Sequence, residues 1–241
     1  MSERDQRVDG ESVFLLASEP WRESSLKLEV FSRNYGRVAL LARGARRPQG
    51  GLRGVLIPFV PVCAAWYGGK ALKTLHRAQW LGGWPQPRGR ALFGGLYVNE
   101  LVLKMTGRED ASPALFDAVS EVMRAVCSGG EYAAALRRFE WKLLCLSGYA
   151  PDLHHDALGD EIDAGRRYWV RPEHGVLPVA CSDMPGGVAA EGRVLAALRD
   201  GVFPDADVLQ QALKVTRLLL DFRLPEGIVS RRVLQQVRGF L

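Results

Sequence analysis

Apolar and polar residues alternate in the first third of the chain, which is typical of half-buried strands. In residues 24–32, Leu26, Leu28 and Val30 face one side, and this period of two predicts a strand. Comparable segments are predicted as strands at residues 12–17, 37–43, 55–67 and 70–80. Five short strands within about 70 residues predict a small closed β-barrel, and the five-stranded oligonucleotide-binding barrel is one such architecture.

The pattern changes after the Gly- and Pro-rich residues 82–87, where apolar residues begin to recur at helical spacing. A helix is expected over residues 88–105, and Ser112 followed by Pro113 is a helix start signal. The helices expected further along the chain cover residues 113–127, 132–147, 191–199, 208–222 and 230–237.

A short hairpin is predicted between these helices, at residues 167–172 and 175–180. The predicted fold class is therefore α+β. An N-terminal barrel domain, residues 1–81, is followed by a helical domain, residues 82–241, in which residues 151–187 form a β-hairpin insertion.

Positive charge is concentrated in the barrel region. Eleven of the 32 Lys and Arg residues lie between Val30 and Asn99, a stretch without a single Asp or Glu, although the whole chain carries only +5. Such polarity favours a polyanionic partner, since guanidinium groups bind phosphate through a planar fork. The candidate nucleic-acid-binding residues are Arg33, Arg37, Arg43, Arg46, Arg47, Arg53, Lys70, Lys73 and Arg77.

Aromatic residues lie near this charge in sequence, and single-stranded bases stack on such rings. They are Phe31, Tyr35, Phe59, Trp66 and Tyr67. The alternative interpretation, that most of them belong to the core, stays open at this point.

Several catalytic classes lack their motifs. The glycine-rich loop has no G-x-x-x-x-G-K-[ST] sequence for nucleotide hydrolysis, and the barrel region has no carboxylates to hold the metal of a nuclease. A G-x-S-x-G elbow is also missing, and the acidic run Asp160–Asp163 fits a solvated loop. We therefore expect a protein that is not an enzyme and that needs no cofactor.

Metal binding is not expected either. His154, His155, Asp156 and His174 are the best candidate ligands, but they do not show the spacing of a zinc site. The four cysteines are far apart and are expected to be buried thiols. The N-terminus has no targeting segment, and no run approaches the roughly 18 apolar residues of a membrane span, so a soluble, cytoplasmic protein is expected.

A second candidate site lies in the helix at residues 132–147. Arg137 and Arg138 stand beside Phe139 and Trp141 in an otherwise apolar segment. They form either an ordinary solvated face or an arginine-rimmed groove for an acidic peptide with a hydrophobic end.

The chain resembles the RecO family of bacterial DNA repair and recombination mediators over nearly its whole length. The order and spacing of short motifs carry this resemblance: Glu23-Ser24-Ser25, Gly36-Arg37, A-R-G-A-R-R at residues 42–47, Leu52-Arg53-Gly54, Pro58-Phe59, Leu72-Lys73-Thr74-Leu75, Tyr97-Val98-Asn99-Glu100-Leu101, Leu115-Phe116, Leu136-Arg137-Arg138-Phe139-Glu140, Gly148-Tyr149 and Ser230-Arg231.

The resemblance implies an oligonucleotide-binding barrel followed by a helical domain, without a nucleotide cofactor. It implies a cytoplasmic, nucleoid-associated protein that binds single- and double-stranded DNA and anneals complementary strands. It also implies that RecR and the acidic C-terminal tail of the single-stranded-DNA-binding protein are partners, so that the RecA recombinase is loaded.

One stretch departs from the family. Many RecO-like proteins carry a four-cysteine zinc site after the Gly-Tyr motif, whereas residues 151–161 here contain no cysteine. We expect the zinc module to be lost and replaced by the predicted hairpin. Two other hypotheses remain open: a basic adaptor that docks an acidic protein, and an RNA-binding barrel.

Overall fold

The structure is a computed structural model, and the residues that it describes are 7–47, 50–52, 54–179 and 185–238. Contacts within the chain divide it into two compact units, of which the first joins residues 1–130 to residues 229–241 and the second comprises residues 131–228.

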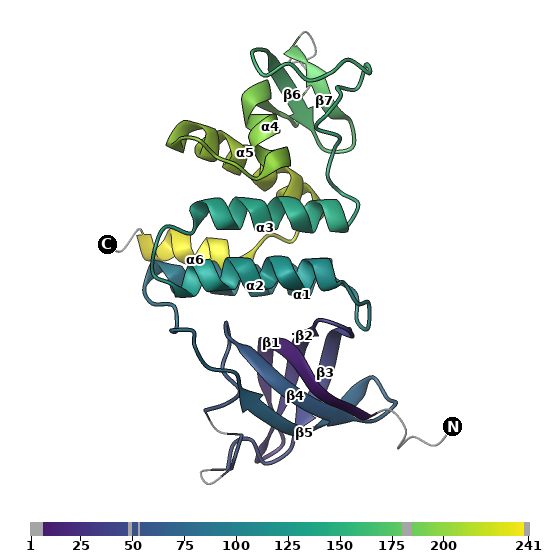
Figure 1. Ribbon diagram of the computed structural model, residues 1–241, viewed down its shortest axis with the longest axis vertical. Helices are drawn as coiled ribbons and strands as arrows, with labels where there is room; N and C mark the ends of the chain where they lie inside the picture. The colour runs from purple at the N-terminus through teal and green to yellow at the C-terminus, as the bar shows by residue number, and fades with distance from the viewer. Residues whose placement is uncertain (1–6, 48–49, 53, 180–184, 239–241) are drawn as a thin grey trace. The chain divides into compact units, whose positions relative to one another are not determined.

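Five strands of the first unit close into a barrel (Figure 1). They are β1 (Arg7–Trp21), β2 (Ser25–Ser32), β3 (Gly36–Ala42), β4 (Pro61–Tyr67) and β5 (Leu72–Trp80). The order around the barrel is β1-β2-β3-β5-β4, and every neighbouring pair is antiparallel except β3 with β5. The predicted fold class, an oligonucleotide-binding type of barrel followed by helices and a small sheet, is confirmed.

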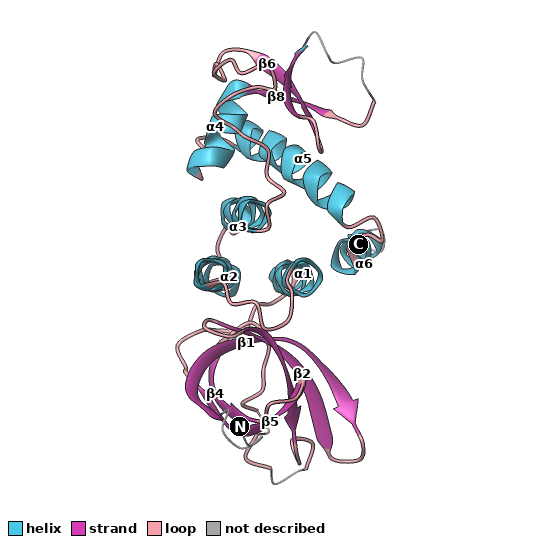
Figure 2. Cartoon of the chain, turned by 90° about the vertical axis from the view of Figure 1, so that its right-hand side faces the viewer, coloured by secondary structure: helices cyan, strands magenta, loops and turns pink. Residues whose placement is uncertain are grey.

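The strand β1 buries both of its faces near its middle. Val13 and Leu15 belong to the barrel core, whereas the ring of Phe14 lies outward, 5.3 Å from the ring centroid of Phe116. The helices α1 (Arg90–Met105) and α2 (Pro113–Cys127) lie along this side of the barrel, as Figure 2 shows. The apolar run of β1 therefore does not alternate, because the barrel and the helices each cover one face.

A buried amide fixes the junction between α1 and the barrel. The register of β1 shifts between Leu15 and Ala17, and the side-chain nitrogen of Asn99 donates to the carbonyl oxygens of Leu15 and Leu16 at 3.1 and 3.2 Å. A strand irregularity leaves backbone groups without a ladder partner, and buried carbonyls need donors. Asn99 supplies the donors at this position.

The helix α2 begins as expected from the sequence. The side chain of Ser112 accepts a hydrogen bond from the backbone nitrogen of Leu115, and Pro113 takes the first helical position. A serine oxygen satisfies one of the four amide donors that a helix start leaves open.

The second unit combines helices with a three-stranded sheet. Its elements are α3 (Ala133–Leu146), β6 (Arg167–Arg171), β7 (Gly175–Pro178), β8 (Val188–Glu191), α4 (Gly192–Asp200) and α5 (Ala206–Arg223). The predicted hairpin corresponds to β6 and β7, but a third strand, β8, pairs with the other edge of β6. The short, glycine-flanked β8 shows no alternation that could have revealed it in the sequence.

The compact units do not divide the chain where the strands give way to helices. The predicted domain boundary after residue 81 lies between the end of β5 at Trp80 and the start of α1 at Arg90. By contacts, however, α1, α2 and the last helix, α6 (Val229–Arg238), group with the barrel. Of the described helices, none combines the length and the apolar character required to cross a membrane.

A single carboxylate joins α6 to α1. Glu100 accepts hydrogen bonds from the backbone nitrogens of Val229 and Ser230 at 2.7 and 2.8 Å, and it pairs with Lys104 at 3.1 Å. Burial alone would raise the pKa of Glu100, but the bonds from Ser230 and Val229, with help from Lys104, outweigh burial and lower that pKa. Glu100 thus caps the start of α6 from a different helix.

We expect Glu100→Ala to lower the free energy of unfolding by about 1 kcal/mol at neutral pH, the usual cost of losing a helix cap. A lowered folded-state pKa means that this stabilisation is present above the ordinary carboxyl pKa of about 4.3 and is lost as the pH falls through the folded value. Urea unfolding of parent and variant over a pH series measures the difference. Glu131→Ala is the control, and a gap between parent and Glu100→Ala that does not change with pH would contradict the capping role.

Candidate nucleic-acid interface

Nine cations were expected from the sequence to bind nucleic acid, and eight of them lie among the described residues, since Arg53 falls outside. Ion pairs with carboxylates join Arg33 to Asp117, Arg37 to Glu29, and Lys73 to Glu109. The partners lie outside the acid-free stretch in sequence, and the fold brings them back onto it.

Arg33 and Arg37 attach the barrel to its helical segments, Arg33 through its ion pair and Arg37 through a hydrogen bond. Arg33 binds both carboxylate oxygens of Asp117 on α2, one of them at 3.1 Å, and this hydrogen bond raises the pKa of the Arg33 guanidinium. Arg37 donates to the carbonyl oxygen of Thr106 at 2.9 Å and lies 3.7 Å from a carboxylate oxygen of Glu29. Both arginines therefore have structural roles within the first unit.

Lys73 is also engaged. Its ammonium pairs with Glu109 and donates to the carbonyl oxygen of Lys70 at 3.3 Å, and its side chain is only 11% exposed. Lys70 itself lies in the exposed turn before β5. Of these two lysines, only Lys70 is well placed on the surface to meet a phosphate.

The loop between β3 and β4 closes one end of the barrel. Its apolar residues join the barrel core, and they are Ala45, Leu52, Val55 and Leu56. The strand expected at residues 55–67 begins only at Pro61, because residues 55–60 belong to this loop. The described part of the loop thus packs its apolar residues into the end of the barrel and carries Arg43, Arg46 and Arg47 on its exposed side.

Arg46 anchors this loop to the neighbouring turn. Its guanidinium donates to the carbonyl oxygens of Arg22 and Glu23 at 3.4 and 3.3 Å, and its backbone nitrogen donates to Ser24 at 2.9 Å. Although Arg46 is exposed, one nitrogen of its guanidinium is used in these contacts, which attach the loop to the turn.

Arg43, Arg47 and Arg77 are exposed, and none of them pairs with a carboxylate in the part of the chain that the structure describes. Leu41 of β3 and Thr74 of β5 are partners in a parallel pair. Both Arg43 and Arg77 follow these partners along the chain, so they lie toward the same end of the barrel. Among the candidate arginines that the structure describes, these three guanidinium groups are therefore the ones best placed to bind phosphate.

The aromatic candidates separate into two groups. Phe31, Phe59 and Trp66 are buried, as the core interpretation predicts, whereas Tyr35 and Tyr67 are exposed. Two exposed rings were missed, Trp21 at the end of β1 and Trp80 at the end of β5. Their position as the last residues of strands is the signal that could have revealed them.

The predicted peptide-binding groove on α3 differs in the structure from the groove expected from the sequence. Arg137 is buried and pairs with the buried carboxylate of Glu140, which also accepts a hydrogen bond from Thr216. Phe139 is buried as well. The prediction that Arg137 and Phe139 line an open groove is therefore wrong, because both serve the core of the second unit.

Only part of that predicted groove reaches the surface. Arg138 is exposed, and its aliphatic stem lies beside Gly201, where an added Cβ would come within 3.2 Å of the Arg138 Cδ. Trp141 is half-buried. A contact with an acidic peptide would have to use Arg138 and the exposed edge of Trp141.

The cysteine-free segment after Gly148-Tyr149 is held by aspartates. The carboxylate of Asp156 accepts from the backbone nitrogens of Leu158 and Asp160 at 2.9 and 3.1 Å, and Asp152 accepts from His154 at 2.7 Å. These side-chain turns organise the backbone locally. Within the described ranges, His, Cys, Asp and Glu side chains form no group of three or more that could hold a metal ion.

Comparison with known proteins gives two adjoining family matches. Residues 11–84 match the model described as "Recombination protein O N terminal", and residues 86–232 match "Recombination protein O C terminal". The junction between the two matches lies close to the boundary expected after residue 81.

Individual relatives match over almost the whole chain. The chain is 60% identical to the DNA repair protein RecO of Neisseria meningitidis serogroup C, with 98% of this chain and 91% of the relative covered. It is 58% identical to the RecO of Neisseria gonorrhoeae, covering 98% and 97%, and 43% identical to the RecO of Aromatoleum aromaticum, covering 97% and 98%.

We expect Arg137→Ala to destabilise the protein by about 3–5 kcal/mol, because it would leave the buried carboxylate of Glu140 without its ion-pair partner. Arg138→Ala, one position along the same helix, is the matched control and should cost about 0.5 kcal/mol or less. Thermal or urea unfolding followed by circular dichroism measures both. Equal losses for the two variants would show that Arg137 is not a structural residue.

Proposed function

The chain belongs to the RecO family of DNA repair proteins, and we propose that it acts as a recombination mediator without enzymatic activity. In this proposal it binds single- and double-stranded DNA, anneals complementary strands, and helps to load the recombinase onto DNA coated with single-stranded-DNA-binding protein. The observation that carries the proposal is the group of exposed arginines Arg43, Arg47 and Arg77 toward one end of the barrel, for which the described residues provide no carboxylate partner.

Annealing of two strands requires that their phosphate charges be neutralised, but it does not require that a covalent bond be made or broken. Two complementary strands repel each other through their phosphates, and arginines that contact both strands lower this repulsion and release counterions. Guanidinium groups bind phosphate without reading sequence, so any complementary pair can be brought together. Bases then pair by their own hydrogen bonds, which requires no nucleotide cofactor.

The arrangement of the loop supports fast exchange of strands. Arg43 and Arg47 sit on the exposed side of a loop whose apolar side is buried in the barrel. The backbone is therefore held in place, while the long arginine side chains keep their rotamer freedom. Such contacts neutralise phosphates without enclosing the strand, so a completed duplex can leave.

Partners are part of the same proposal. RecR and the acidic tail of the single-stranded-DNA-binding protein are the expected protein partners, and the cytoplasm is the expected compartment. An acidic peptide that ends in an apolar side chain matches the exposed Arg138 with the half-buried Trp141 on α3.

The DNA-binding proposal is tested with Arg43→Ala/Arg47→Ala/Arg77→Ala. If each arginine contacts one phosphate, the slope of log affinity against log salt should fall by about 2 on single-stranded DNA, since each contact contributes about 0.7. Annealing of complementary strands coated with the binding protein, without ATP, should slow by at least about tenfold. Fluorescence anisotropy and a strand-pairing assay measure the two effects.

A variant with the same loss of charge elsewhere provides the control. Lys142, Lys214 and Arg232 are exposed residues of the helices, and their replacement by Ala should leave the salt slope unchanged. If both triple variants behave alike, net charge alone governs binding and the proposed surface is wrong. Tighter binding of matched RNA oligomers, or no binding of plain DNA, would favour the RNA-binding or adaptor hypotheses instead.

The partner proposal is tested with Arg138→Glu. Reversal of this charge should weaken binding of an acidic peptide ending in Phe by about tenfold and should leave the binding of naked DNA unchanged. Lys214→Glu on α5 is the control for a change of equal charge. Unchanged peptide affinity in Arg138→Glu would move the partner site away from α3.

A further inference from the structure

A cavity of about 380 Å³ opens at the end of the barrel away from the arginine loop. The residues that line it come from β1, β3, β4 and β5, from the turn between β2 and β3, and from the loop after α1. They are Arg7, Val8, Asn34, Tyr35, Val38, Trp66, Lys73 and Glu109. Its volume falls in the range of sites that bind small molecules. None of the functions proposed above uses this cavity.

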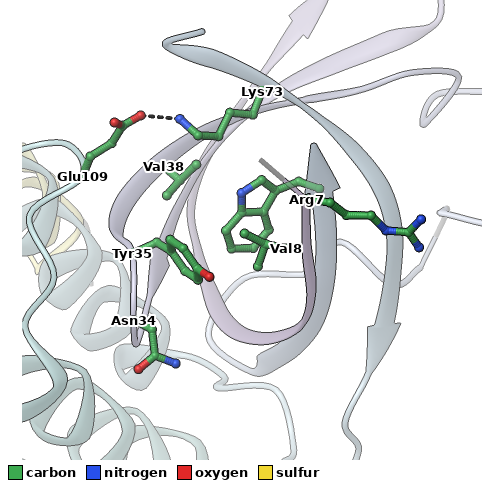
Figure 3. Close-up of a pocket in the computed structure, with 8 residues that line it drawn as sticks. Arg7, Val8, Asn34, Tyr35, Val38, Lys73 and Glu109 are labelled. Atoms are coloured by element: carbon green, nitrogen blue, oxygen red, sulfur yellow. Dashed lines mark hydrogen bonds and ion pairs between the residues drawn. The ribbon is translucent and has the colours of Figure 1, made fainter. Parts of the chain in front are cut away.

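Aromatic and apolar side chains form its interior. Figure 3 shows Tyr35, Val8 and Val38 around the opening. The rings of Tyr35 and Trp66 meet nearly at right angles, with centroids 5.4 Å apart and an interplanar angle of 80°. Trp66 is buried, whereas Tyr35 lines the cavity and is 43% exposed, so its side chain is accessible to a planar ligand.

Polar groups of both kinds stand around the rim. The Lys73 and Glu109 side chains pair on one side in Figure 3, and Arg7 lies on another. The Asn34 amide is held in place, because its side-chain and backbone nitrogens donate to the Glu11 carboxylate at 3.0 and 2.9 Å. The rim therefore offers fixed hydrogen-bond donors and acceptors beside a ring that can stack.

We propose that this cavity accepts a single unstacked base of the DNA strand that the barrel binds. The inference rests on the DNA binding proposed above and adds a base subsite to it. A nucleobase is flat, neutral and edged with donors and acceptors, which matches an open tyrosine face next to an ion pair and an amide. Arg7 at the rim is paired with Asp9 at 2.8 Å, so this side of the opening, too, carries charges of both signs.

The path from the arginine end to the cavity is short. Arg77 and Lys73 lie on β5, four residues apart, which corresponds to about 13 Å of strand and to about four stacked nucleotides. The exposed rings of Tyr67 and His76 pack against each other along this stretch, with centroids 6.4 Å apart. A single strand bound at the arginines can follow β5 and place one base in the cavity.

The charge at the rim favours a base over an acidic peptide. Glu109 neutralises Lys73, the most buried cation of the site, and its own side chain remains 57% exposed at the opening. A peptide carboxylate would face this negative charge, whereas a neutral base can accept from Lys73 and donate to Glu109. The peptide is thus the less suitable occupant, and competition with it is an outcome of the test.

The test compares a thymidine strand of about twelve nucleotides with an abasic strand that has the same number of phosphates. Tyr35→Ala should weaken binding of the thymidine strand by about tenfold and leave the abasic strand unaffected, because only the former has bases to stack. Tyr35→Phe keeps the ring and should restore the affinity of the parent protein. Val8→Phe, which fills the cavity without removing Tyr35, should produce the same selective loss as Tyr35→Ala.

The outcomes distinguish a failure of the proposed DNA binding from a failure of the proposed base subsite. If the parent protein binds neither strand, the proposed DNA binding itself fails. If it binds both strands and Tyr35→Ala weakens both equally or neither, DNA binding stands and the base subsite is overturned. A loss in Tyr35→Ala without a loss in Val8→Phe, or competition by an acidic peptide but not by mononucleotides, also overturns it.

Discussion

The closure of the barrel between β3 and β5 is the constraint on which the first unit depends. These two strands are parallel neighbours, and β4 lies on the far side of β5. The chain cannot pass from β3 to β4 by a tight turn, so the connection has to cross the end of the barrel. Its apolar side chains fill that end, and its arginines are left outside. The same loop thus closes the end of the barrel with its apolar side and carries the candidate phosphate-binding arginines on its exposed side.

Carboxylates from distant parts of the chain then decide which cations remain available. Glu29 engages Arg37 within the barrel, whereas Glu109 and Asp117 engage Lys73 and Arg33 and so attach the barrel to the segments around α1 and α2. The positive region is therefore narrower than its sequence suggests. Arg43, Arg47 and Arg77 remain exposed toward one end of the barrel. Lys73 instead lies at the edge of the aromatic cavity.

Local patterns were enough to predict much of the fold. Alternation located β2, apolar runs located the other strands of the barrel, and Ser112 with Pro113 located the start of α2, because these signals act within a few residues. Signals that depend on distant partners were not visible in the sequence. The burial of Arg137 requires Thr216 and Glu140, the pairing of β8 requires β6, and the pairing of Arg33 requires Asp117. In the candidate sites, the residue type therefore indicates which side chains could bind a ligand. Whether such a side chain is exposed and free to do so is decided by tertiary contacts.

The attachment of α6 has a consequence for the order in which the chain is made. The barrel and α1 leave the ribosome early, whereas α6, which completes the same unit, follows only after the whole of the second unit. Until then the apolar side chains of Leu16, Phe93 and Leu103, which line the cleft beside α6, lack this neighbour, and the carboxylate of Glu100 has no helix to cap. Domains generally fold as they emerge during synthesis. The first unit can therefore complete its packing only after the second unit has been made, because α6 follows the second unit along the chain.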